Sequence, residues 1–264
     1  MLPKLLAIDL DGTTLNSDGE ISVKNQQYLQ KITQSGVQLV VATGRSSYSA
    51  SQFITQMGVK QAYIVALNGA AVYRWGDSEP LMTTQIPESI IDEIISIGDS
   101  NQINTYFSTL AQSYVWVRDQ SLMAMFASSH ELKSITTPTE LKADRQHFAK
   151  ILYCTKNPEY LANLVTKVQA LPVEAAKPDE MCLELTAKNT SKANGLAFLG
   201  QHLNILPAEM AAVGDSENDF EMLKFVGNGI VMANGMPHIK AIADYVTLSN
   251  DRDGLAYAIE RLLG

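Results

Sequence analysis

Carboxylates stand at two places in the 264-residue chain where a short apolar run ends. Asp9 and Asp11 follow the first run, and Asp215 and Asp219 follow a later one. Like charges this close repel each other, so they need a cation or a shared proton. Carboxylates without His or Cys suit Mg²⁺, which prefers oxygen ligands. Either pair alone could be a solvated loop, with Asp219 capping the helix that follows.

Two further positions carry groups that could bind an anion. Thr43-Gly44-Arg45 precedes a predicted helix, where a hydroxyl and backbone N–H groups face an anion at the positive helix end. Lys192 begins another predicted helix and could reach a phosphate as a compact charge. Considered singly, the first could be a plain strand–helix turn, Lys192 a surface lysine, and Arg45 half of a structural ion pair. The chemistry therefore rests on carboxylates, a lysine, hydroxyls or a hard metal.

The elements that must position these groups alternate regularly at the start of the chain. Apolar runs at 5–8, 37–42 and 63–67 are separated by helical patterns at 22–34 and 47–57. This alternation predicts a parallel sheet with right-handed crossovers. The carboxyl ends of parallel strands converge on one crevice, so the polar clusters are expected to meet there.

The rhythm changes in the middle of the chain and then returns. Residues 81–185 mix short strands with separate helices, which is typical of an α+β domain. From residue 191 the alternation resumes, and we expect helices at 192–203, 219–225, 238–243 and 254–263, with strands at 210–213, 229–232 and 245–247. An insertion explains this better than two domains in tandem. The predicted domains are a core of 1–80 with 186–264, and an inserted domain of 81–185.

Composition excludes several classes of protein. Lys and Arg total 20 against 28 Asp and Glu, a net charge of −8, which argues against nucleic-acid and anionic-membrane partners. No apolar stretch approaches the ~20 residues that span a bilayer, and the first run is too short for a signal peptide. Cys154 and Cys182 lack metal-ligand or Cys-x-x-Cys spacing, so they are expected to be reduced, buried thiols of a cytoplasmic protein. The histidines are expected to be surface or structural residues: His130, His147, His202 and His238.

Taken together, the motifs resemble those of one family. Asp9-Leu10-Asp11-Gly12-Thr13 matches the DxDGT motif of the haloacid dehalogenase-like (HAD) phosphohydrolases. Thr43-Gly44-Arg45 after a strand looks like the second motif and Lys192 like the third. Gly214-Asp215-Ser216-Glu217-Asn218-Asp219 looks like the fourth, in its GDxxND form.

The position of the insertion resembles one branch of that family. Little more than one helix fits between Asp11 and Thr43, and the long insertion lies between the second and third motifs. This is similar to the Cof-type subfamily, which Asn68-Gly69-Ala70 and Asn250-Asp251-Arg252-Asp253-Gly254 also match. The resemblance implies an α/β fold, with a Rossmann-like parallel-sheet HAD core and an inserted α+β cap domain.

The resemblance also implies a mechanism. Asp9 would be the nucleophile that forms an aspartyl phosphate, which water then hydrolyses. Asp11 would be the general acid for the leaving alkoxide and then the base for water. Mg²⁺ would be held by Asp9, by Asp215 and by Asp11 through its backbone carbonyl, and would screen the nucleophile from the phosphate.

The remaining motif residues are implied to handle the transferring group. Thr43 and the Gly44 N–H would bind phosphoryl oxygens, and Lys192 would offset negative charge. Asn218 would orient the phosphoryl group or Lys192. The residues implied to support these groups without touching the substrate are Arg45 and Asp219.

These implications lead to one functional hypothesis and two alternatives. The expected activity is a Mg²⁺-dependent phosphatase of small phosphorylated metabolites, with sugar phosphates favoured. An acid at position 11 favours phosphomonoester hydrolysis or a mutase, so a phosphomutase of the phosphomannomutase type is the first alternative. The second alternative, from another class, is a non-catalytic regulator that binds a phosphometabolite.

Overall fold

The structure, a computed structural model, describes residues 2–126, 132–177 and 180–264, and the chain divides into two compact units. The core unit comprises Met1–Thr83 and Ser191–Gly264, and the inserted unit comprises Thr84–Thr190. The predicted boundaries, at 80/81 and 185/186, lie three and five residues before these. The predicted fold class, a parallel-sheet α/β core interrupted by an α+β insertion, is confirmed.

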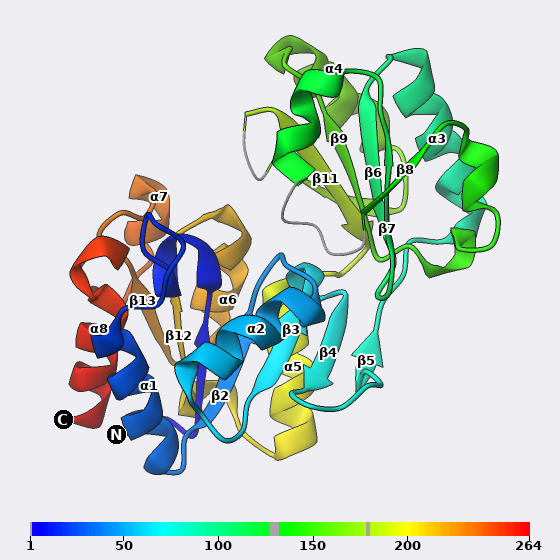
Figure 1. Cartoon of the computed structure of the whole chain (residues 1–264). Helices are drawn as coiled ribbons and strands as arrows, with labels where there is room; N and C mark the ends of the chain where they lie inside the picture. The colour runs from blue at the N-terminus through cyan, green and yellow to red at the C-terminus, as the bar shows by residue number, and fades with distance from the viewer. Residues whose placement is uncertain (1, 127–131, 178–179) are drawn as a thin grey trace. The chain divides into compact units, whose positions relative to one another are not determined.

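The core unit is built on one sheet with strand order β14-β13-β12-β1-β2-β3-β4-β5 (Figure 1). Its strands are β1 (Leu5–Ile8), β2 (Gln38–Ala42), β3 (Tyr63–Ala66), β4 (Ala71–Arg74), β5 (Met82–Thr83), β12 (Met210–Gly214), β13 (Asn228–Val231) and β14 (Tyr245–Val246). The pairs from β14 through β1 to β3 are parallel, as predicted. The antiparallel additions β4 and β5 were not predicted.

Helices cover this sheet on both faces. They are α1 (Val23–Gln34), α2 (Ser47–Met57), α5 (Lys192–Leu203), α6 (Phe220–Phe225), α7 (Pro237–Lys240) and α8 (Gly254–Leu263). Leu5 and Ala7 of β1 pack with apolar residues of α5 and α6. Helix α1 contacts α2 and α8, and these three lie together on the sheet (Figure 1). Local caps explain why α1 and α2 were predicted accurately: the Oγ atoms of Ser22 and Ser46 accept N–H groups at their starts, and Gly58 ends α2 in the left-handed conformation.

The inserted unit has a six-stranded sheet with order β10-β11-β9-β6-β7-β8. Its strands are β6 (Asn104–Ser108), β7 (Ser113–Trp116), β8 (Leu132–Ile135), β9 (Lys150–Cys154), β10 (Val173–Ala176) and β11 (Cys182–Ala187), and its helices are α3 (Ile91–Ser100) and α4 (Pro158–Val168). Among the strand pairs described in this unit, β7 and β8 alone are parallel. The two helices bury apolar residues such as Ile94 and Leu164 against one face of the sheet, around Phe107 and Tyr153. This is the α+β organisation that the sequence predicted.

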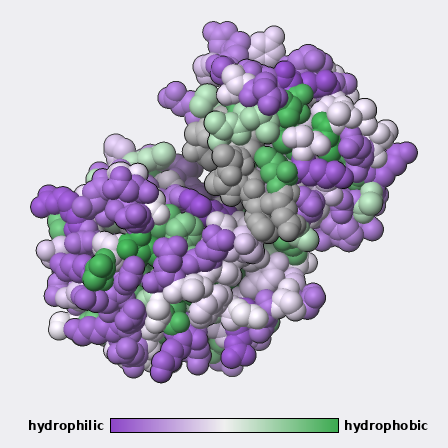
Figure 2. Space-filling model, viewed as in Figure 1, coloured by the Kyte–Doolittle hydropathy of each residue, from purple (hydrophilic) through white to green (hydrophobic). Residues whose placement is uncertain are grey.

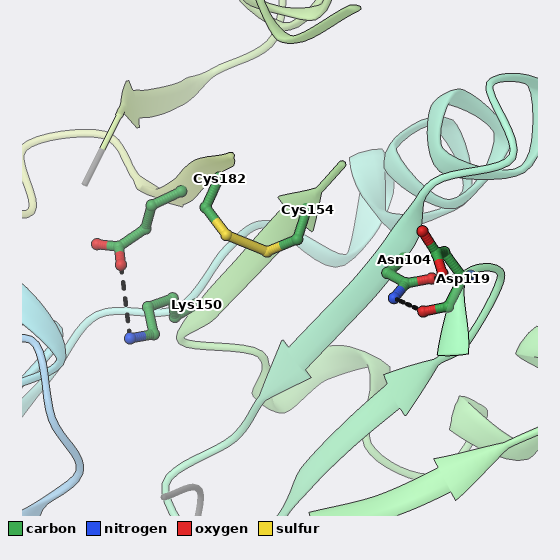
Figure 3. Close-up of a disulfide and its surroundings, with 6 residues drawn as sticks. Asn104, Asp119, Lys150, Cys154 and Cys182 are labelled. Carbon is green, nitrogen blue, oxygen red and sulfur yellow. Dashed lines mark hydrogen bonds and ion pairs between the residues drawn. A yellow bond between two sulfur atoms is a disulfide. The ribbon is translucent and has the colours of Figure 1, made fainter. Parts of the chain in front are cut away.

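The two cysteines form a disulfide, which corrects the prediction that they are reduced thiols (Figure 3). Cys154 ends β9 and Cys182 begins β11, and the antiparallel register places them directly opposite each other with 4.4 Å between their Cα atoms. Such a short separation is typical of a non-hydrogen-bonded cross-strand pair. Both residues are buried, as expected. Spacing could not reveal the partnership, because strand register brings together residues 28 positions apart.

The surface agrees with the composition. In the view of Figure 2 hydrophilic residues cover most of the core unit, and apolar side chains are scattered among them. His147, His202 and His238 are exposed, as predicted, whereas His130 lies outside the described residues. None of the helices in the described ranges has both the length and the apolar character needed to span a bilayer.

Candidate active site

The loops that carry the predicted site residues leave the carboxyl ends of neighbouring parallel strands. Asp9 follows β1, Thr43 follows β2, and Asp215 follows β12. A short helical turn, Leu10–Thr14, continues from β1, and another, Glu217–Asp219, precedes α6. The strand order puts β12, β1 and β2 side by side, so these loops meet at one edge of the core sheet.

A buried ion-pair trio forms the centre of this edge. Lys192 Nζ donates to Asp9 Oδ1 at 2.6 Å and to Asp219 Oδ1 at 2.7 Å. Lys192 and Asp219 are fully buried, and Asp9 is 4% exposed. Charges are rarely buried so completely unless they are paired. Lys192 is therefore not a surface lysine, and Asp219 does more than begin a helix.

Burial and neighbouring charges shift the pKa values of this trio. Burial raises the pKa of Asp9 above its ordinary value, and the carboxylates of Asp219 and Asp215 add to the rise, while Lys192 opposes it. Burial would lower the pKa of Lys192, but the charges of Asp219 and Asp9 outweigh it and raise the pKa. The lysine thus stays cationic, and Asp9 lies in an environment short of positive charge.

Asp215 adds a third carboxylate to this environment. Single oxygen atoms of Asp9, Asp215 and Asp219 lie within 4.8 Å of one another. The Thr13 hydroxyl donates to Asp215 Oδ1 at 2.7 Å. Burial raises the pKa of Asp215 to about 6, with only partial relief from Thr13. Three carboxylates therefore face one ammonium group, and full ionisation would leave two negative charges in excess.

This cluster fits a divalent cation of the hard, oxygen-preferring class. Asp219 is already engaged, because Oδ1 accepts from Lys192 and Oδ2 accepts the backbone N–H groups of Asp215 and Ser216 at 3.0 and 3.1 Å. The carboxylates of Asp9 and Asp215 are the ones best placed to hold an ion. A 2+ charge would match the excess of two negative charges, and the donor set is all oxygen.

The carboxylate of Asp11 is held apart from this cluster by Arg45. Arg45 Nε donates to Asp11 Oδ2 at 2.8 Å, and Arg45 Nη2 donates to Asp11 Oδ1 at 2.6 Å. This two-pronged geometry is the strongest that a guanidinium forms with a carboxylate. The hydrogen bond to Asp11 raises the pKa of Arg45. The structure thus contains the ion pair that was one of the two interpretations of Arg45 from the sequence.

Thr43 and Gly44 lie where β2 turns into the loop before α2. Thr43 is fully buried; its backbone N–H donates to Val65 O of β3, and its Oγ1 accepts the Arg45 N–H at 3.2 Å. Gly44 is partly exposed. A backbone hydrogen bond therefore connects Thr43 to β3, and Thr43 and Gly44 lie at the same edge of the sheet as Asp9.

Asn218 has a different partner from the one considered in the sequence. Its Nδ2 donates to Asn68 Oδ1 at 3.1 Å, and its Oδ1 accepts from Ser216 Oγ at 2.6 Å. The hydrogen bonds of Lys192 go to Asp9 and Asp219 instead. Asn68 is a residue of this edge to which sequence reasoning gave no role. An Asn-Gly pair directly after a buried strand was the available signal, since it marks a turn with positive φ.

A second polar network, also missed, fastens the loop after Asp11. Asn234 Nδ2 donates to Gly12 O at 2.7 Å, and Asn250 Nδ2 donates to Leu15 O at 2.9 Å. Both Asp251 carboxylate oxygens accept from Ser17, at 2.7 Å each. These side chains come from the last part of the chain, so the C-terminal loops hold the first motif in place.

Comparison with known proteins gives one consistent result. A family described as haloacid dehalogenase-like hydrolase matches residues 6–259. Phosphatase YwpJ of Bacillus subtilis is 30% identical, and the match covers 98% of this chain and all of that protein. The 5-amino-6-(5-phospho-D-ribitylamino)uracil phosphatase YitU of the same organism is 28% identical over 96% of this chain and 95% of its own length. A solved haloacid dehalogenase-like hydrolase from B. subtilis superposes with a TM-score of 0.89 at 27% identity, covering 98% of this chain and 99% of that one.

Proposed function

We propose that this chain, which belongs to the haloacid dehalogenase-like hydrolases and is one of their phosphatases, is a Mg²⁺-dependent enzyme that forms an aspartyl phosphate. The observation that carries the proposal is the buried trio of Asp9, Lys192 and Asp219. It holds one carboxylate in a fixed orientation, at a strand end, in a setting where negative charge exceeds positive charge.

Asp9 is the proposed nucleophile. Lys192 binds its Oδ1, which fixes the carboxylate and leaves Oδ2 as the oxygen that attacks phosphorus. Asp219 in turn fixes Lys192, because its other oxygen is anchored by the backbone N–H groups of Asp215 and Ser216. Such positioning and electrostatic stabilisation account for most of the catalysis of phosphoryl transfer. Water then hydrolyses the aspartyl phosphate, which releases inorganic phosphate and restores the Asp9 carboxylate.

Asp11 is the proposed general acid and base. Its carboxylate is exposed and two residues from the nucleophile, where a leaving alcohol and an attacking water would both be in reach. While Arg45 binds both oxygens, the carboxylate accepts hydrogen bonds but has no proton to give. Donation to the leaving group therefore requires a protonated Asp11 from which the Arg45 contact has loosened. The proton passes to the leaving oxygen, and the carboxylate left on Asp11 then takes a proton from the attacking water.

Mg²⁺ would be held by the carboxylates of Asp9 and Asp215 and by the backbone carbonyl of Asp11. When bound, it supplies charge that lets an anionic carboxylate approach an anionic phosphate. Thr13 orients Asp215 for this task through its hydrogen bond to Oδ1. The pKa of Asp215, raised to about 6 by burial, leaves that carboxylate mostly ionised at neutral pH.

The phosphoryl oxygens would be bound by groups on neighbouring loops. The Thr43 hydroxyl and the Gly44 N–H follow β2, and Lys192 begins α5. Asn218 keeps a second amide N–H after its bond to Asn68, and this donor would bind a phosphoryl oxygen. Together they would surround the transferring group with donors while the carboxylates stay on the side of the metal.

The substrate class is proposed to be small phosphorylated metabolites, with sugar phosphates favoured. The name of the YitU relative specifies a phosphate ester on a ribityl chain, a polyol leaving group of the same chemical kind. The net charge of −8 disfavours a nucleic-acid partner. A cytoplasmic location also remains a proposal, and it now rests on the metabolite substrate, because the disulfide removes the argument from reduced thiols.

A phosphate-release screen tests this function. Sugar phosphates, nucleotides and cofactor phosphates are offered to the full chain, with Mg²⁺ or with EDTA. We expect release from a subset of sugar phosphates that is lost in EDTA and restored by Mg²⁺. Phosphate transfer that requires a bisphosphate activator and releases none would indicate a mutase instead. Tight ligand binding with no release from any ester would indicate a non-catalytic regulator.

A further inference from the structure

The turn Leu67–Gly69 after β3 contacts three of the four motif loops. The Leu67 N–H donates to Arg45 O, and the Asn68 N–H donates to Thr43 O, each at 3.0 Å. The Asn68 side chain reaches the fourth motif through Asn218. Gly69 packs so closely on the Ser191 carbonyl, next to Lys192, that a Cβ atom would overlap it. These contacts do not involve the loop of the first motif.

The backbone of this turn is in a conformation that most side chains avoid. Leu67 has φ +50°, Asn68 has φ +55° and Gly69 has φ +103°. A bulky leucine at positive φ is unusual, and asparagine adopts this region more readily than most residues. Strained backbone of this kind persists where the surrounding structure enforces it, and it concentrates at functional sites.

The amide of Asn68 also packs against Gly44. A Cβ atom at position 44 would lie 3.2 Å from Asn68 Oδ1 and 3.3 Å from Asn68 Nδ2. The outer end of the amide therefore packs against Gly44, the residue whose N–H is proposed to bind a phosphoryl oxygen. One amide thus packs against Gly44 and accepts a hydrogen bond from Asn218.

We infer that Asn68 is a positioning residue of the phosphoryl site. It acts through two neighbours, because it fixes the Gly44 peptide by packing and the Asn218 amide by a hydrogen bond. This inference rests on the proposed function, since both neighbours are assigned to the phosphoryl group there. It adds a fifth element to the four motifs, one that joins the β2 loop to the β12 loop.

Asn68→Gly separates the side chain from the backbone. Glycine adopts positive φ freely, so this variant keeps the turn and removes the amide. We expect kcat/KM for the best ester of the screen to fall about tenfold and the Kd of inorganic phosphate to rise about tenfold, the effect of losing a hydrogen bond that orients a binding group. The melting temperature should stay near that of the wild type. Asn68→Ala should show the same loss, together with a lower melting temperature caused by strain.

A double-mutant cycle with Asn218→Ala tests the proposed route. If Asn68 acts through Asn218, adding Asn68→Gly to Asn218→Ala should weaken phosphate binding by much less than tenfold. If the double variant weakens phosphate binding by the product of the two single fold-changes, Asn68 does not act through its hydrogen bond to Asn218. If Asn68→Gly has the kinetics and phosphate affinity of the wild type, the inference is wrong. Neither result bears on whether the wild-type protein hydrolyses phosphate esters. Failure of the proposed function would appear separately, as a wild-type protein that hydrolyses no ester.

Discussion

The two units bury charge in different ways. In the core unit, Asp9, Asp219 and Lys192 are buried in direct contact, and Asp215 adds a further carboxylate. Among the contacts described in the inserted unit, one carboxylate–lysine pair is largely shielded from solvent: Lys150 and Glu184, 3.5 Å apart, with side chains 12% and 8% exposed. Lys150 lies on β9 and Glu184 on β11, the two strands that the disulfide joins (Figure 3). The other ion pairs described in this unit, such as Arg118–Asp99, lie at the surface.

The difference lies in charge balance. Lys150 and Glu184 neutralise each other, so the chain itself satisfies that pair. The core cluster has three carboxylates and one ammonium group, so something outside the chain must balance it. An unbalanced buried cluster destabilises the fold as long as nothing neutralises it, and such an arrangement points to a function rather than to a structural role. The following predictions test this contrast.

The largest expected effect is on activity, from Asp9→Asn. Without a nucleophilic carboxylate, turnover should fall by roughly 10⁴-fold or more, as when other covalent nucleophiles are removed. The fold should survive, because Lys192 keeps Asp219 as its partner and one negative charge leaves the cluster. Phosphate release and near-ultraviolet circular dichroism measure the two quantities. Turnover near that of the wild type would exclude Asp9 as nucleophile.

Lys192→Met should damage both activity and stability. It leaves Asp9 and Asp219 buried without their cation, which costs about 3–5 kcal/mol of unfolding free energy. Denaturant unfolding in EDTA measures this loss. Adding Asp219→Asn to the same variant should restore part of the stability and none of the activity. If Lys192→Met alone were as stable as the wild type, the buried carboxylates of Asp9 and Asp219 would not depend on Lys192 for their charge balance.

The disulfide should contribute a similar unfolding free energy to the inserted unit, through a covalent bond instead of an ion pair. A cross-link between residues 28 positions apart restricts the unfolded chain and stabilises the fold by about 3–4 kcal/mol. Hydrogen exchange with and without dithiothreitol should show faster exchange in β9 and β11, with the core unit unchanged. The Cys154→Ala, Cys182→Ala double variant should match the reduced protein and respond to no reductant. Two free thiols in the protein purified without reductant would contradict the bond.

This bond marks the limit of what the sequence could predict. Ser22, Ser46 and Gly58 act on their own helices, so element boundaries in the core were readable from local chemistry. The motif residues follow predicted strands, and parallel topology brings them to one edge. The pairing of Cys154 with Cys182 depends instead on the register of two antiparallel strands.

The candidate active site shows the same difference between features that local sequence determines and features that long-range contacts determine. Asp9, Thr43 and Asp215 were placed by strand topology, since each directly follows a strand of the sheet. The contacts of Arg45 with Asp11 and of Asn218 with Asn68 depend on side-chain directions and on a turn with positive φ. No local pattern specifies contacts of that kind.

The pH dependence of stability should expose the excess charge. The pKa of Asp215 is raised by burial from 3.8 to about 6, so the folded protein binds this proton more tightly than the unfolded chain. The stabilisation is therefore complete below pH 4 and is lost as pH rises through 6. In EDTA, the wild type should lose about 1–3 kcal/mol more than Asp215→Asn between pH 4 and pH 7. Saturating Mg²⁺ should reduce that difference at pH 7. Parallel stability curves for the two proteins in EDTA would contradict the raised pKa.

The smallest effect is expected where the buried charges are balanced. Replacing Lys150 with Met and Glu184 with Leu together removes both charges of the pair. Buried pairs replaced in this way by apolar side chains are often as stable as before, so the change in unfolding free energy should stay within about 1 kcal/mol. Lys150→Met alone should cost several times more, because Glu184 then stays buried without its cation. If the double variant lost more than about 3 kcal/mol of unfolding free energy, this pair would have a specific role that apolar side chains cannot replace. Balance alone would then not separate the structural charges of the inserted unit from the functional charges of the core.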